Sequence, residues 1–314
     1  MRKFNLRNGV LKVKQKPIYV EINMNAPIDT VWEYTQNPKL HEQWDLRFSE
    51  INYIPKKAED SPQTFTYKTN VLPFISVEGW GESKGTHHKQ NGSRTSSLHF
   101  GTEQRISPIV QGKGYWQYVP KGDKLTFLTQ YDYDARYGKI GQAFDVVFRP
   151  LIGWATALSF DVLKRWIDTG EPPALQYRRF FLSILISILF FFIWFYQGLV
   201  PKLIVVHPEE VALISAISGI KGTAAQLVVQ GIGVAEILFS LIWLMPINKR
   251  PLYILQIALF PMLLISAVAA SSATLTGPFN VLTLNIALFV LSIIGFVLHQ
   301  NIPTAKSCKR KRGE

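Results

Sequence analysis

The residue that offers the clearest chemistry is a glutamate inside an apolar run, Glu236 within 224–245. A carboxylate within a hydrocarbon layer costs about 2.5–3.5 kcal/mol, so it is expected to face a bundle interior or a polar cavity. Two interpretations stay open. Glu236 either handles a proton or orients a ligand, as the candidate catalytic residue, or it is a protonated carboxyl that links helices by hydrogen bonds. The candidate polar partners from this and the other apolar runs are Gln197, Gln230, Gln256, Asn280 and Asn285.

A second group of polar residues follows the first apolar run, with Lys202 and then His207-Pro208-Glu209-Glu210. Proline after His207 favours a helix start, and both glutamates would then lie near the positive end of the helix dipole. The segment therefore either begins a helix or forms a site for a polar substrate or a quinone head group. A metal site would need a third ligand, and no metal is predicted. The candidate ligand-binding residues of the second half of the chain are Gln197, Lys202, His207, Glu210, Gln230, Glu236, Asn280 and Asn285.

The first half of the chain offers aromatic side chains instead of a catalytic pattern. On strands, such residues either fill a core or line a cavity, and an apolar cavity suits a lipid, a polyketide-like molecule or an isoprenoid. No nucleophile–base pair has a recognisable spacing, and His87–His88 are expected to face solvent after a turn at Gly85. Phosphate-loop, dinucleotide, haem and hydrolase-elbow motifs are absent from the sequence. The candidate cavity residues are Trp44, Tyr67, Trp80, Trp116, Tyr131 and Tyr133.

Four apolar segments in the second half have the roughly 20 residues needed to cross a bilayer. They lie near 180–200, 224–245, 252–270 and 279–298. Arg178–Arg179, Lys249–Arg250 and the basic tail 301–314 flank them on one side. Because Lys and Arg accumulate in cytoplasmic loops, both termini and the soluble domain are expected in the cytoplasm of a multi-pass cell-membrane protein.

The formal net charge of +12 comes with no nucleic-acid recognition motif. Anionic lipid head groups at the basic flanks are therefore the expected counter-charge, and nucleic acid is not an expected partner. The single cysteine, Cys308, excludes an intrachain disulfide and a thiolate metal cluster, and an inert thiol is the preferred interpretation.

The first half divides into a basic arm at 1–16, a domain at 17–170 and a linker at 171–177. Alternating polarity predicts an opening strand at 17–26 and helical spacing predicts a short helix from Ile28. After Gly138 a helical period returns for some thirty residues, and Pro150 is expected to bend or restart that helix. Turn signals separate further strands at 48–54, 64–71, 76–83, 94–99, 114–119 and 125–133.

The order of these elements resembles the START-type, polyketide-cyclase-like (SRPBCC) superfamily. The segment that carries the resemblance is YVEINMNAPIDTVWEYTQNPKLHEQWD, from Tyr19 to Asp45. It matches the usual opening of that superfamily, a strand, then Ala-Pro, then a helix with Val-Trp. The resemblance implies an α+β helix-grip domain, an antiparallel sheet wrapped on a long C-terminal helix with a cavity between them.

The second half resembles the DoxX-like family, which implies an all-α bundle of four transmembrane helices over 178–300. The carrying segments are Phe195–Leu203, His207–Glu210, Gly233–Leu244 and Pro278–Phe289. Relatives of that family include a membrane subunit of thiosulfate:quinone oxidoreductase, so the resemblance makes quinone the candidate cofactor; the residues themselves indicate none.

Three hypotheses follow for function. In the leading one, the cytoplasmic domain binds a hydrophobic small molecule (lipid, isoprenoid or quinone-like) and the bundle receives it or acts on it. In the second, the chain is a quinone-linked oxidoreductase subunit in which Glu236 handles protons. In the third, it is a scaffold that pairs with another membrane protein or with itself. A non-enzymatic binder is preferred over an enzyme.

Overall fold

The computed structural model describes residues 15–56, 58, 61–72, 74–270, 275 and 280–313 of the 314-residue chain. The predicted arm at 1–16 lies outside the described residues, except for its last two residues. Residue 279, where the fourth predicted span begins, also lies outside them. The chain divides into two compact units. The first comprises residues 1–176 together with 303–314, and the second comprises 177–302.

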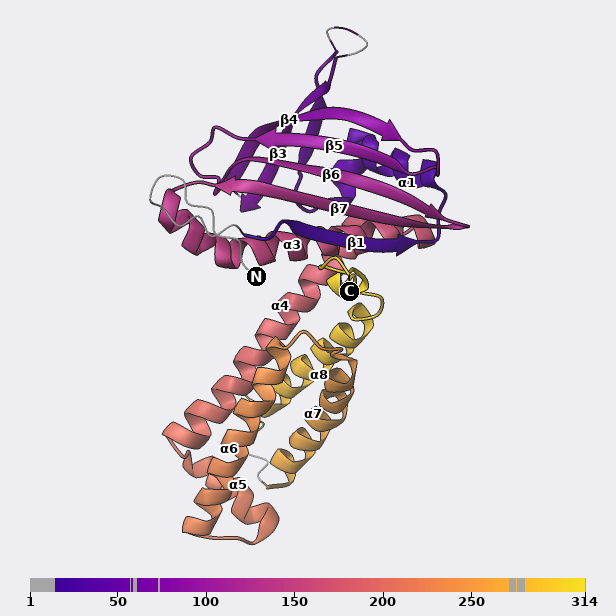
Figure 1. Cartoon of the computed structure of the whole chain (residues 1–314). Helices are drawn as coiled ribbons and strands as arrows, with labels where there is room; N and C mark the ends of the chain where they lie inside the picture. Colours follow the sequence, from indigo (N-terminus) through magenta and orange to yellow (C-terminus); the bar gives the residue numbers. More distant parts are fainter. Residues whose placement is uncertain are drawn as a thin grey trace. The chain divides into compact units, whose positions relative to one another are not determined.

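The first unit is built on one antiparallel sheet, shown in Figure 1. Its seven strands are ordered β1-β7-β6-β5-β4-β3-β2, so all strands after β1 form a meander and β1 pairs with the last of them. The register between β1 and β7 places Ile18 beside Tyr131 and Met24 beside Leu125. The antiparallel sheet is as predicted. The strands are β1 (Ile18–Met24), β2 (Glu50–Tyr53), β3 (Gln63–Leu72), β4 (Ile75–His88), β5 (Arg94–Gly101), β6 (Ile109–Lys121) and β7 (Lys124–Ala135).

One prediction in this sheet was wrong. The chain does not turn at Gly85; β4 continues to His88 with a register shift between Ser83 and Gly85. Gly85 has φ +125°, a conformation that favours glycine, and such a residue fits an irregularity inside a strand. His87 and His88 are both exposed, as expected, although they lie on a strand.

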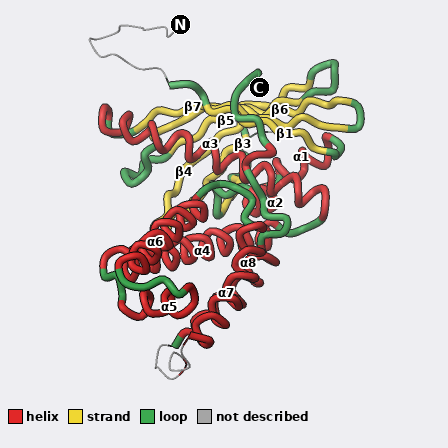
Figure 2. Tube along the Cα trace, turned by 90° about the horizontal axis from the view of Figure 1, so that it is seen from below, coloured by secondary structure: helices red, strands yellow, loops and turns green. Residues whose placement is uncertain are grey.

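The long helix α3 (Gly138–Thr169) lies along one face of the sheet in both views (Figures 1 and 2). The short helices α1 (Ile28–Gln36) and α2 (Pro38–Trp44) follow β1. The core between these layers includes Phe127, which stacks on Phe160 of α3 at a ring distance of 4.5 Å. Both side chains are fully buried, as is Trp44. Burial of this apolar surface is the main stabilising contribution to the unit.

Pro150 does not restart α3, which runs as a single helix through it. A proline inside a helix removes one N–H donor, here the partner of the Val146 carbonyl. Both residues are exposed, so water can satisfy that carbonyl.

The connection to the next helix is shorter than the predicted linker at 171–177. Gly170 ends α3 in the left-handed conformation, and α4 (Pro173–Gln197) begins with proline at its first position, where the missing N–H costs nothing. Only residues 170–172 separate the two helices. Gln176, in the first turn of α4, is fully buried and donates hydrogen bonds to the carbonyls of Val162 and Glu171.

The second unit is all-helical, as predicted. It contains most of α4, the π-helix η1 (Gly198–Ile204), α5 (Pro208–Ser218), α6 (Thr223–Leu244), α7 (Arg250–Ala270) and α8 (Val281–Leu298). Its buried core draws on all four long helices, with Phe190 and Trp194 from α4, Trp243 from α6, Phe260 from α7 and Leu288 from α8.

Five described helices are long and apolar enough to cross a membrane, one more than the four predicted. The additional helix is α3, which packs on β1 and β7 in the first unit and belongs to the helix-grip arrangement. The other four are α4 with η1, α6, α7 and α8. The chain is therefore a membrane protein with several candidate membrane-spanning helices, four of which follow residue 172.

The basic tail after α8 is not a free end, because it packs on the first unit. The Thr304 amide donates to Asp161 Oδ2 at 2.8 Å, and Lys309 exchanges two backbone hydrogen bonds of 2.9 Å with Glu21 of edge strand β1. Cys308 donates to the Ala157 carbonyl, and burial raises the pKa of its thiol to about 12. A thiol with such a pKa is unreactive at neutral pH.

Candidate functional site

The first unit contains a cavity of about 800 Å³ between the sheet and α3. The strands and α3 place apolar side chains on its wall because alternate strand residues and every third or fourth helix residue point the same way. On α3 these are Ile140, Phe144, Phe148 and Ile152. Aromatic residues of the facing strands and of the loop before β2 complete the wall, among them Phe48, Phe65, Tyr67, Phe100, Trp116 and Tyr131.

Three of the six predicted cavity residues, Tyr67, Trp116 and Tyr131, line this cavity. The other three lie elsewhere. Trp44 is fully buried and donates to the Tyr34 carbonyl. Trp80 is 36% exposed and contacts His99 edge-on, and Tyr133 donates a hydrogen bond to the carboxylate of Asp145. Sequence alternation alone does not tell which strand face carries the cavity.

A charged pair lies at one wall of this apolar cavity. Arg47, which lines it, binds Asp45 in a bidentate manner, with Nε–Oδ1 at 2.9 Å and Nη2–Oδ2 at 2.6 Å. His41, also on the wall, lies 3.1 Å from Asp45 Oδ2. Burial alone would raise the pKa of Asp45, but Arg47 and His41 outweigh it and hold that pKa well below its usual range. Asp45 is thus ionised and keeps Arg47 positioned.

Tyr131 adds a hydroxyl group beside this pair. Its ring lies 5.4 Å from the guanidinium carbon of Arg47, and its Oη lies 2.9 Å from Thr156 Oγ1. Burial raises the pKa of Tyr131, so the phenol keeps its proton at neutral pH. We call Arg47, His41 and Tyr131 the polar end of the cavity. Sequence reasoning missed Arg47, although its position two residues after Asp45 and next to Phe48 was a signal.

Exposed apolar side chains surround part of the cavity wall. Val71 is 58% exposed and Ile106 is 58% exposed, and on α3 Ile140 is 80% exposed and Phe144 is 54% exposed, yet all four line the cavity. Phe74, in the turn between β3 and β4, is 99% exposed. The cavity wall therefore continues into exposed apolar surface at these four residues. We call these five residues the apolar rim.

The second unit brings together three charged residues from three elements. Lys202 of η1 lies 3.2 Å from Glu236 Oε2 of α6 and donates to Glu210 Oε1 of α5 at 3.3 Å. Gly198 and Gly233 allow this approach, because a Cβ on either would lie 2.7 Å or less from the other's carbonyl oxygen. These three residues, all candidates from the sequence, form what we call the charge cluster.

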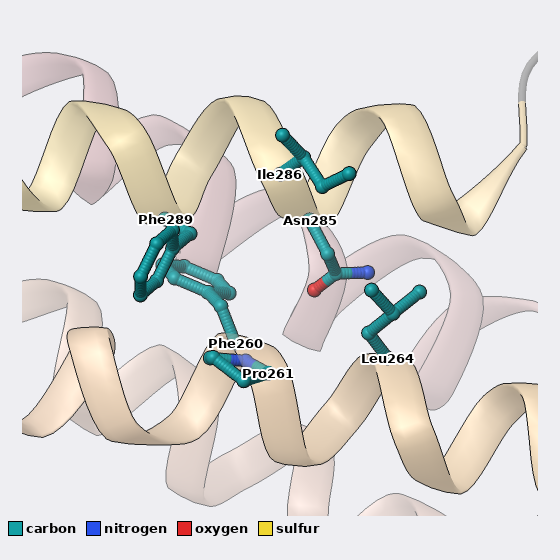
Figure 3. A pocket seen from close by; sticks show the side chains of 6 residues that line it. All are labelled: Phe260, Pro261, Leu264, Asn285, Ile286 and Phe289. Atoms are coloured by element: carbon teal, nitrogen blue, oxygen red, sulfur yellow. The ribbon is translucent and has the colours of Figure 1, made fainter.

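The remaining candidates of the second unit lie outside the charge cluster. His207 caps α5 by accepting a hydrogen bond from the Glu209 amide, which is the predicted helix start. Asn280 caps α8 in the same way with Thr283. Asn285 lines a separate small cavity of about 80 Å³ between α7 and α8, shown in Figure 3. Gln197 and Gln230 are partly buried on α4 and α6.

Within the described residues, no three His, Cys, Asp or Glu side chains lie close enough together to hold a metal ion.

The chain is similar to several known proteins. The model of the DoxX-like family matches residues 191–293. Solved structures align with about half of this chain. One is the STAR-related lipid transfer protein from Xanthomonas axonopodis (17% identity, 48% of this chain and 84% of that chain, TM-score 0.36). Another is a Helicobacter pylori protein (12% identity, 51% and 97%, TM-score 0.33).

The fold therefore defines a membrane protein in which an antiparallel sheet packed on a long helix precedes a helical bundle, and the DoxX-like family model matches within that bundle. The chain belongs to the family of the uncharacterized membrane protein YndG of Bacillus subtilis (strain 168). The two are 37% identical over 303 residues, which cover 96% of this chain and 99% of YndG.

Proposed function

We propose that the helix-grip domain binds one amphipathic, mostly apolar molecule and exchanges it with the bilayer to which the domain is attached. The observation that carries this proposal is the cavity of about 800 Å³ with its aromatic wall. Ligand sites of small molecules occupy roughly 300–1,000 Å³ and are mostly apolar with a few placed polar groups.

The polar end of the cavity supports a ligand that carries an oxygen-rich head group. Arg47 uses Nε and Nη2 for Asp45, and its planar guanidinium has five N–H donors in all. A carboxylate, a phosphate or a quinone carbonyl could accept from the remaining donors and from Tyr131. The aromatic wall would surround an acyl or isoprenoid chain, so lipids, isoprenoids and quinones are the ligand classes that fit.

The apolar rim supports exchange with lipid instead of with water. Residues 170–172 reach at most about 10 Å, so the domain cannot diffuse away from the first span. Phe74 and Ile140 are the most exposed rim residues, and the basic residues Lys139 and Arg105, both exposed, flank the rim. Apolar side chains beside basic ones suit the interface of an anionic bilayer. The occupant we propose for this surface is the lipid bilayer.

The cytoplasmic orientation is part of this proposal. Arg178–Arg179, Lys249–Arg250 and the tail would all lie on one side of four spans. That distribution supports a cytoplasmic domain under the positive-inside rule.

The experiment is extraction and mass spectrometry of molecules that copurify with the full-length protein in a mild detergent. We expect one lipid, isoprenoid or quinone in about equimolar amount, retained through washes that remove bulk lipid. Protein that carries no such molecule and takes up none from added vesicles would contradict the proposal.

A second candidate function is that of a quinone-linked oxidoreductase subunit, which is favoured by the position of Glu236 beside Lys202 inside the spans. It predicts that Glu236→Gln lowers quinone-dependent turnover. Turnover unchanged by this substitution would contradict it.

A further inference from the structure

The charge cluster holds an unequal number of charges. Lys202 contributes one positive charge, and Glu210 and Glu236 contribute up to two negative ones. Glu236 lies about 20 Å along α6 from its first residue and about 12 Å from its last, so it is well inside the helix. Lys202 is buried, with 8% of its surface exposed. A net charge at such a position is costly, because the hydrocarbon layer does not solvate it.

Few other charges face the cluster. On α6, Glu236 is the only charged residue; α8 has none, and α7 has only Arg250 at its first position. On α4 the charged residues are Arg178 and Arg179, at the opposite end from η1. His207 and Glu209, the neighbours on the α5 side, are exposed. Within the described residues, the balance of the cluster therefore depends on its own three side chains.

The two carboxylates are bound differently. Lys202 makes its hydrogen bond to Glu210, at 3.3 Å. Its ammonium also forms an ion pair with Glu236 Oε2 at 3.2 Å, but that buried oxygen has no hydrogen-bond partner among the described residues. Glu210 is thus the better-satisfied carboxylate, and Glu236 is the one that gains more from a proton. The π-helical segment that presents Lys202 is also an uncommon conformation that often occurs at functional sites.

We propose that the charge cluster is a binding site for one exchangeable proton, held on the carboxyl of Glu236 while Lys202 remains an ammonium ion. Adding the proton from water takes the cluster from a net charge of −1 to 0, and releasing it restores −1. The distances and burial of Lys202, Glu210 and Glu236 support this proton site, whatever ligand the first unit binds.

The test is infrared difference spectroscopy of the full-length protein in lipid bilayers, recorded between high and low pH. We expect a protonated-carboxyl band that is lost in Glu236→Gln. It should remain in the matched control Glu209→Gln, which changes an exposed glutamate one residue from the cluster. Removal of the ammonium in Lys202→Met should make the band persist to higher pH, by about one to three pH units, which is the effect of one nearby opposite charge.

Identical pH titrations of the wild type and Glu236→Gln would overturn the proposal. A band that at fixed pH depends on sodium concentration would also overturn it, because the site would then bind a metal cation. If Glu236→Gln does not fold, Glu236→Asp retains a carboxyl in a different position, and a band that does not move in this variant would contradict the assignment.

Discussion

The polar end of the cavity leads to the most specific prediction, which concerns Arg47. Replacing it with methionine keeps an unbranched side chain but removes the guanidinium that faces the cavity. A hydrogen bond to a charged group contributes about 1.5–3 kcal/mol. Since about 1.4 kcal/mol corresponds to a tenfold change in Kd, Arg47→Met should weaken binding of an anionic amphiphile about 10- to 150-fold.

The assay is fluorescence titration of the full-length protein in detergent with a fluorescent long-chain carboxylic acid and with its methyl ester. The acid should show the loss and the ester should bind almost unchanged, because only the acid carries a charge for Arg47. The matched control is Arg149→Met. Arg149 also pairs with two aspartates, Asp132 at 2.6 Å and Asp145 at 2.8 Å, but it does not line the cavity. Equal losses for acid and ester, or a similar loss in the control, would refute the assigned role of Arg47.

Three further predictions follow from single contacts. Gly233→Ala should destabilise the bundle by about 1–3 kcal/mol, because its Cβ would lie 2.7 Å from the Gly198 carbonyl oxygen. Gly231→Ala should leave the stability unchanged, because its Cβ would meet open space. The thermal midpoint of unfolding in detergent measures the stability of both variants. Lys309→Pro should release the tail to proteolysis by removing an N–H that pairs with β1, whereas Lys309→Ala should not. For Asp45, whose pKa is lowered in the folded state, the stabilisation is present above the unfolded pKa of about 3.9 and is lost as pH falls below it. Denaturation followed against pH should show this loss in the wild type and not in Asp45→Asn.

The sequence was most informative where the pattern is local and repeated. Alternating polarity predicted the opening strand, and turn signals between short runs predicted the other six strands up to Ala135. The four spans were predictable because each helix must satisfy its own backbone within lipid. The charge cluster was predictable in part, since Glu236, Lys202 and Glu210 are conspicuous charges next to apolar segments.

What could not be predicted depends on contacts between distant segments. Nothing local indicates that Lys309 returns to Glu21, because that pairing uses backbone atoms and not side-chain type. Arg47 was missed for a similar reason, since only the fold shows that it faces a cavity and not solvent. The six aromatic candidates for the cavity lie in three places, namely the core, the cavity wall and the outer face of the sheet. A two-residue period in the sequence does not distinguish these places.

The central claim is that the cavity of the helix-grip domain holds the ligand, and native mass spectrometry of two alanine variants on α3 tests it most directly. Ala155 lines the cavity, whereas Ala143 is exposed and does not line it. The wild type and Ala143→Phe should each retain one bound lipid-like molecule, and Ala155→Phe should lose it because the phenyl group occupies the cavity. A molecule retained equally by all three proteins, or by none of them, would contradict the account.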